Sequence, residues 1–147
     1  MNIRRIEAGI LNAGSDFDQT TTPYDVGLGR FVDEDKGDFI GKAALASAPR
    51  ELRLFGIKCM SGEPLIASPV ESEGKNIGTV TAGAMSPYLE HGIGIARLDK
   101  ANLSAGSNVQ VGCRDGNLHA AELVEMPFYD KLAEIPRGKR VDIPSKP

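Results

Sequence analysis

The strongest fold signal in this sequence is the pair Asp115-Gly116, which separates two runs of alternating apolar and polar residues. The runs cover residues 108–114 and 117–124. A type I′ turn needs positive φ at both central residues, and an Asp-Gly pair adopts that conformation readily. The sequence therefore predicts a β-hairpin with a type I′ turn at this position.

Further β-rich runs lie upstream of this hairpin. Residues 52–59 alternate in polarity with a slip in phase at Gly56, which predicts a strand with a bulge. Residues 77–82 and 92–96 predict two more strands, and residues 72–76 have the composition of a hairpin loop. Five or six short strands without intervening helices predict an antiparallel barrel or sandwich.

The first 50 residues have a different pattern, with turn chemistry and two helix signals. Residues 22–25 combine a capping hydroxyl, proline and an acid, which predicts a short helix that Gly27 soon ends. Asp38 is placed to cap a second helix over residues 39–48, whose apolar residues recur at helical spacing. The predicted fold is therefore mainly β, preceded by a short α-containing segment.

The composition excludes several classes of protein. The 147 residues include 17 Lys and Arg against 20 Asp and Glu, and 41% are hydrophobic. This acidic balance argues against nucleic-acid binding, which needs clustered basic residues. No uncharged stretch approaches the ~20 apolar residues of a membrane helix, and residues 1–5 lack the apolar core of a secretory signal. We expect a cytoplasmic protein that binds neither nucleic acid nor membrane.

The residues that most often carry chemistry form no complete set. Cys59 and Cys113 are the only cysteines, and we expect two buried thiols rather than a disulfide in a reducing compartment. His91 and His119 have no metal spacing and no neighbouring nucleophile motif, so we expect structural or solvated roles for both. The residues alone thus predict no catalytic residue and no metal site.

Four stretches in a fixed order carry a resemblance to a known family. They are residues 3–11 (IRRIEAGIL), 22–29 (TPYDVGLG), 36–45 (KGDFIGKAAL) and 78–87 (GTVTAGAMSP), with residues 127–130 (PFYD) following. Together they resemble the C-terminal part of the aminomethyltransferase family, whose type member is the T-protein of the glycine cleavage system. The resemblance covers nearly all of this chain and somewhat under half of a family member.

The resemblance implies a tetrahydrofolate-dependent aminomethyl- or methyltransferase with a distorted antiparallel barrel, Greek-key or jelly-roll-like, as its last domain. Residues 1–50 would be a remnant of the folate-binding domain with a connector helix, residues 51–130 the barrel, and residues 131–147 an exposed tail. The family's catalytic aspartate and its pterin-binding glutamate lie upstream. We therefore expect no turnover by this chain alone, and a missing N-terminal half in cis or in trans. A true T-protein would also interact with a lipoyl carrier protein.

One candidate site residue follows from the resemblance. Arg5 matches the arginine of the family's Leu-Arg-Leu-Glu-Ala-Gly stretch, which lines the folate side of the cavity, and a guanidinium offers fixed donors to pterin or carboxylate acceptors. The alternative is that Arg5 only pairs with Glu7 or another acid. Ala13 replaces a tyrosine that many members carry before the glycine matching Gly14, so an aromatic contact with folate is lost.

Other functions remain open at this level. The sequences of residues 4–7 (RRIE) and 38–42 (DFIGK) are similar to those of the methyl-donor branches of the family, such as dimethylsulfoniopropionate demethylase and dimethylglycine dehydrogenase. The chain is then the end of a sulfonium demethylase or of a flavin-linked demethylase of the dimethylglycine or sarcosine type. A non-catalytic barrel that serves as a binding or scaffold module is the remaining alternative.

Overall fold

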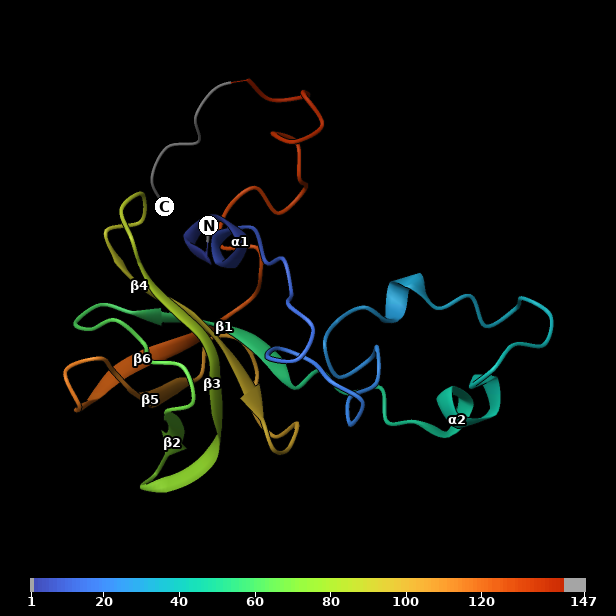
Figure 1. Ribbon diagram of the computed structural model, residues 1–147, viewed down its shortest axis with the longest axis horizontal. Helices are drawn as coiled ribbons and strands as arrows, with labels where there is room; N and C mark the ends of the chain where they lie inside the picture. The colour runs from blue at the N-terminus through green and yellow to red at the C-terminus, as the bar shows by residue number, and fades with distance from the viewer. Residues whose placement is uncertain (1, 142–147) are drawn as a thin grey trace.

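Six antiparallel strands close into a barrel in the computed structural model, which describes residues 2–141 (Figure 1). The strands are β1 (Leu54–Cys59), β2 (Pro69–Ser72), β3 (Lys75–Ser86), β4 (His91–Leu98), β5 (Asn108–Gly112) and β6 (Leu118–Val124). Their order around the barrel is β1-β4-β3-β2-β5-β6, and β6 pairs back onto β1. The prediction of a mainly β antiparallel barrel is confirmed. Met1 and residues 142–147, the last part of the predicted tail, lie outside the described residues.

The hairpin predicted around Asp115-Gly116 is confirmed, but its turn type is not I′. Gly116 has a φ of 85°, whereas Asp115 is not among the residues with positive φ. The Gly116 N–H donates to the Cys113 carbonyl and the Cys113 N–H to the Asn117 carbonyl, each at 2.9 Å. This is a type I turn followed by a glycine bulge, which needs positive φ at one residue only. The Asp115 carboxylate supports it by accepting the Asn117 N–H at 3.1 Å.

The type I′ geometry occurs instead in the β2–β3 hairpin, at the loop predicted over residues 72–76. Glu73 and Gly74 connect the two strands directly, with φ of 51° and 73°. Positive φ at both central residues matches the right-handed twist of the flanking strands.

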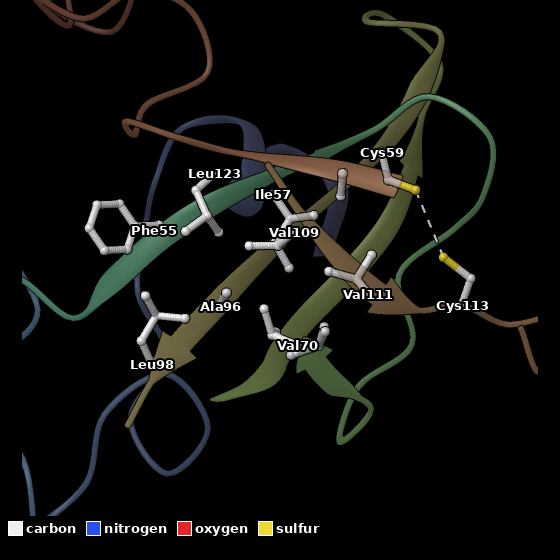
Figure 2. Packing of buried hydrophobic residues seen from close by; sticks show 12 residues of the cluster. Phe55, Ile57, Cys59, Val70, Ala96, Leu98, Val109, Val111, Cys113 and Leu123 are labelled. Atoms are coloured by element: carbon white, nitrogen blue, oxygen red, sulfur yellow. Dashed lines mark hydrogen bonds between the residues drawn. The ribbon is translucent and has the colours of Figure 1, made fainter. Parts of the chain in front are cut away.

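The interior of the barrel is filled by apolar residues from all six strands (Figure 2). They are Phe55, Ile57, Cys59, Val70, Val80, Ala96, Leu98, Val109, Val111, Cys113, Ala121 and Leu123. Pro64, from the loop between β1 and β2, is also buried and fills one end of the interior. It occupies the space that Gly83 and Gly94 leave by having no side chain, because a Cβ on Gly83 would lie 1.8 Å from the Pro64 carbonyl oxygen.

A bulge in β3 allows this strand to serve a second apolar cluster outside the barrel. Val80 pairs with Ala96 and Ala82 pairs with Ile95, so Thr81 is one extra residue. Val80 therefore faces the interior, whereas Ala82 faces outward. The outer cluster lies beneath helix α1 (Asn2–Glu7) and consists of Ile6, Val26, Leu54, Ala82, Ala84, Ile93 and Ile95.

The bulge predicted at Gly56 is wrong. Strand β1 pairs with β4 and β6 in continuous register through Gly56. Phe55 and Ile57 face the interior, while Leu54 faces the outer cluster. The apparent slip in phase arose because both faces of β1 are covered, so that apolar residues occur on both of them.

The first 50 residues contain less helix than predicted. The segment after Thr22 forms a single turn, in which the Leu28 N–H donates to the Pro23 carbonyl at 2.8 Å, and the short 3-10 helix η1 (Gly29–Phe31) follows. Helix α2 (Lys42–Ser47) is shorter than the predicted 39–48, because Gly41 with a φ of 92° occupies its N-cap in place of Asp38. Figure 1 shows the segment that carries η1 and α2 extending away from the barrel.

Candidate functional site

Arg5 lies on α1 and forms an ion pair with a buried acid. Its Nη1 donates to Asp16 Oδ2 at 2.7 Å and to the Ile10 carbonyl at 3.0 Å, and its Nε donates to Asn2 Oδ1 at 3.2 Å. The Asp16 side chain is 0% exposed and that of Arg5 is 18% exposed. Of the two alternatives from the sequence, Arg5 thus does have an acidic partner, and this partner is Asp16 rather than Glu7.

Asp16 is held by two further donors. The Asn12 N–H donates to Oδ2 at 2.8 Å, and Thr81 Oγ1 donates to Oδ1 at 2.6 Å. Thr81 is the bulged residue of β3, and bulges commonly redirect a side chain in this way. The buried carboxylate is therefore satisfied by one cation and two neutral donors, which fixes the loop of residues 10–16 against the barrel.

The guanidinium of Arg5 retains an unused edge. Its hydrogen bonds within the described residues involve Nε and Nη1 but not Nη2. A guanidinium presents donors in a rigid planar fork, so Nη2 beside a fixed Nη1, on a side chain that is 18% exposed, suits a carboxylate or carbonyl acceptor. Chemically, the site offers an oriented cationic donor at the end of a short helix.

Glu7, a second buried acid, lies on the same helix as Arg5. Glu7 accepts hydrogen bonds from Ser86 Oγ at 2.5 Å and from the Tyr129 hydroxyl at 3.1 Å. Burial, and then the hydrogen bond to Glu7, raise the pKa of Tyr129 to about 12, so the phenol remains a donor at neutral pH. The Tyr129 ring packs against Tyr88 with centroids 5.0 Å apart. These contacts fasten the segment that follows β6 onto α1.

The two histidines have hydrogen bonds that the sequence did not indicate. His119 lies between Asp115 and Ser61, with Nε2 to Asp115 Oδ2 at 2.8 Å and Nδ1 to Ser61 Oγ at 3.0 Å. Because an ionised carboxylate only accepts, Nε2 carries a proton and a neutral ring accepts the Ser61 hydroxyl through Nδ1. His91 is buried and its Nδ1 lies 3.0 Å from the Gly92 carbonyl. No signal in the sequence links Ser61 to a residue 58 positions away.

The interpretation of Cys59 and Cys113 as buried free thiols is confirmed. No three His, Cys, Asp or Glu residues gather in metal-binding geometry within residues 2–141. In the same part of the chain, no helix has the length and apolar character needed to cross a bilayer.

A cavity of about 330 Å³ opens on the outer side of β1 and β6. Lys58, His91 and Glu122 line it from strands β1, β4 and β6, and Phe128 and Lys131 line it from the segment after β6. Arg5 is not among its lining residues, so the candidate site and this cavity are separate features of the surface.

The projecting segment of residues 18–52 is tied to the barrel by ion pairs at its two ends. Asp18 pairs with Arg97 on β4 at 3.0 Å, and Asp25 pairs with Arg53 at 2.8 Å. Between these ends the segment exposes apolar side chains, with Phe31 at 71% and Ile40 fully exposed. No residue of α2 is buried.

Acid is expected to weaken the fold between about pH 4 and pH 2. Hydrogen bonds from Thr20 and Arg97 lower the pKa of Asp18 to about 2, and those from His119 and Asn117 lower that of Asp115 to about 2. Because the unfolded value is near 3.9, the stabilisation is complete above that pH and is lost as the pH falls through the folded values. Melting temperatures followed by circular dichroism should be nearly constant from pH 6 to 5 and fall below pH 4. The fall should be smaller in Asp18→Asn, and an equal fall in this variant contradicts the assignment.

The sequence of this chain is similar to those of aminomethyltransferases and of a related demethylase. Residues 52–130 match the family described as "Glycine cleavage T-protein C-terminal barrel domain". An aminomethyltransferase of Saccharopolyspora erythraea is 39% identical over 135 residues, which is 88% of this chain and 36% of that protein. The dimethylsulfoniopropionate demethylase of Ruegeria pomeroyi is 33% identical over 78% of this chain and 33% of its own length.

A solved structure shares the fold. The crystal structure of the glycine cleavage system aminomethyltransferase T from Bartonella henselae superposes with a TM-score of 0.75 at 27% identity, covering 88% of this chain and 38% of that one. The chain therefore spans about a third of the length of the relatives that it matches.

Proposed function

This chain belongs to the family of the glycine cleavage T-protein C-terminal barrel domain, and from that membership we propose that it is the C-terminal segment of a tetrahydrofolate-dependent aminomethyl- or methyltransferase. The observation that carries the proposal is the match over residues 52–130, which contains all six strands of the closed barrel. In this role the barrel forms one wall of a folate cavity and excludes water from it. The complete enzyme acts in the cytoplasm.

Arg5 is the residue of this chain that we propose to hold the folate. Its Nη2 edge fits the carbonyl of a pterin or the carboxylates of the folate tail, because both are planar acceptors. Asp16 positions the guanidinium through Nη1. When bound, tetrahydrofolate supplies the nitrogen atoms that accept the one-carbon unit. The catalytic aspartate of the family comes from the N-terminal part.

The partner of this chain, in the proposal, is an N-terminal half in cis or in trans. The exposed apolar side chains of the projecting segment support this, because an isolated domain rarely leaves large apolar side chains such as Phe31 and Ile40 uncovered. If the enzyme is a true T-protein, a lipoyl carrier protein delivers the aminomethyl group.

A chimera tests the proposal directly. This chain replaces the matching C-terminal region of the Saccharopolyspora erythraea aminomethyltransferase, and formation of methylenetetrahydrofolate and ammonia is measured. We expect activity from the chimera and none from the chain alone. A folded chimera without activity contradicts the transferase function and favours a scaffold module, which also predicts a monodisperse chain without folate binding. Activity of the chain alone contradicts the upstream location of the catalytic group.

The same chimera tests the proposed role of Arg5 in folate binding. Arg5→Lys keeps the charge beside Asp16 but removes the planar fork, so KM for tetrahydrofolate should rise about tenfold with little change in kcat. Arg4→Ala is the matched control, since Arg4 is the exposed neighbour on the same helix. Equal KM values for Arg5→Lys and Arg4→Ala contradict a role of Arg5 in folate binding.

A methyl-donor branch is the second candidate, favoured by the similarity to the dimethylsulfoniopropionate demethylase. The donor contacts of both branches are proposed to lie in the N-terminal part. A second chimera, built on the Ruegeria pomeroyi protein and assayed for loss of a methyl group from a sulfonium donor, tests this candidate. The branch whose chimera has the higher kcat/KM is the one to which this barrel is adapted.

A further inference from the structure

Two thiols meet at one end of the barrel interior. Cys59 is the last residue of β1 and Cys113 follows β5, and the two sulfur atoms lie 3.9 Å apart (Figure 2). The residues are 0% and 2% exposed. They are 54 positions apart in the chain, one in β1 and the other just after β5, so their proximity is a product of barrel closure.

The cover over these thiols is thin at one place. A Cβ on Gly62 would lie 2.8 Å from Cys113 Sγ and 3.2 Å from the His119 ring, so the half-buried Gly62 packs directly against the thiol without a side chain. The loop is fastened nearby, because the Arg114 N–H donates to the Glu63 carbonyl at 2.9 Å and Ser61 bonds His119. We expect a small oxidant to reach the thiol past this glycine, and a large reagent not to.

We propose that Cys59 and Cys113 form an internal modification site, at which a hydroperoxide oxidises the two thiols to a disulfide. One thiolate attacks a peroxide oxygen, the O–O bond breaks, and a sulfenic acid and one water result. The second thiol then attacks the sulfenic sulfur, the S–S bond forms, and a second water leaves. Overall two thiols are oxidised and one hydrogen peroxide is reduced to two waters.

The geometry favours this product over a bond to another molecule. A disulfide requires an S–S distance of about 2.05 Å, so the sulfur atoms, now 3.9 Å apart, must approach by roughly 2 Å. Both thiols face the interior, where each has the other as its nearest sulfur. The bond would join the end of β1 to the end of β5 across the barrel.

The surroundings of Cys113 make the reaction dependent on pH. Burial raises the pKa of this thiol, and the neighbouring Cys59, Asp115 and Glu63 raise it further. His119, on the same hairpin, donates through Nε2 to Asp115. The thiolate fraction therefore grows about tenfold for each pH unit through the neutral range, and the rate of oxidation should be about 100-fold higher at pH 9 than at pH 7.

Mass spectrometry of the full chain tests the proposal. The folded protein is treated with hydrogen peroxide, then unfolded, alkylated and digested with trypsin. We expect a cross-linked pair of peptides, residues 59–75 joined to residues 101–114, which dithiothreitol separates. Recovery of both thiols in alkylatable form, a disulfide between two chains, or oxidation of single thiols without a cross-link overturns the proposal. So does a rate that is independent of pH.

Single-thiol variants provide the control. Cys59→Ala and Cys113→Ala each leave one thiol and should give no cross-linked pair, whereas methionine oxidation by peroxide should be unchanged. The wild-type digest remains decisive if either variant fails to fold. A reagent too large for the Gly62 side, such as a dithiobisbenzoate, should react with neither thiol in the folded wild-type protein. Rapid labelling of both overturns the buried site.

Discussion

Gly83→Ala is expected to destabilise the barrel by about 3 kcal/mol or more and to lower its melting temperature by about 10 °C or more. The added Cβ would lie 1.8 Å from the Pro64 carbonyl oxygen and 2.6 Å from its carbonyl carbon, and both are backbone atoms. Neither rotation nor side-chain repacking relieves such a contact. Either β3 or the loop that carries Pro64 has to move, which opens the end of the barrel interior.

Gly37→Ala is the matched control for this prediction. No heavy atom lies within 4 Å of a Cβ at Gly37, and its φ is not positive. This variant should be within about 0.5 kcal/mol of the wild type. Urea unfolding followed by circular dichroism measures both changes. Coincident unfolding curves for the two variants contradict the close packing of Pro64 against Gly83.

Asp16→Ala is expected to have an effect of similar size, about 3–5 kcal/mol, because it leaves the largely buried Arg5 without its counter-ion and two neutral donors without their acceptor. The substitution removes the acceptor of Arg5, of the Asn12 N–H and of the Thr81 hydroxyl. The loop of residues 10–16 then loses its anchor on β3. Asp16→Asn, which keeps the shape and one carbonyl oxygen, should cost less.

An exposed ion pair gives the comparison for Asp16. Lys131 and Glu125 are paired at 2.8 Å with 66% of each side chain exposed. Glu125→Ala should leave the free energy of unfolding nearly unchanged, since solvent screens such pairs. Equal losses for Asp16→Ala and Glu125→Ala would mean that the Arg5–Asp16 pair is no more important to the fold than a surface pair.

The sequence predicted those parts of the fold that depend on neighbours in the chain. The hairpins at Asp115-Gly116 and at residues 72–76 were visible because a turn and its two strands are adjacent. The helix predicted from residue 22 failed for the opposite reason: its capping signals are present, but glycines follow at once and no extended apolar face is available for packing.

The candidate site depends on contacts that no local pattern reveals. Asp16 is 11 positions from Arg5 and 65 from Thr81, and its contact with Thr81 forms only when the loop of residues 10–16 packs on β3. The resemblance to a family indicated Arg5, whereas its partner had no signal of its own. The bulge at Thr81 was equally hidden, because it matters only when α1 covers the outside of β3.

That bulge also limits how the chain can change its length. Before Thr81 the even-numbered residue Val80 faces the interior, whereas after it the even-numbered residues Ala82 and Ala84 face the outer cluster, so the extra residue sets the boundary between two alternating registers. Deleting it would turn either Val80 or Ala82, with all that follows on that side, to the opposite face. Substitutions at exposed positions of β3 such as Thr79 are therefore open to natural variation, whereas insertions and deletions near residue 81 are not.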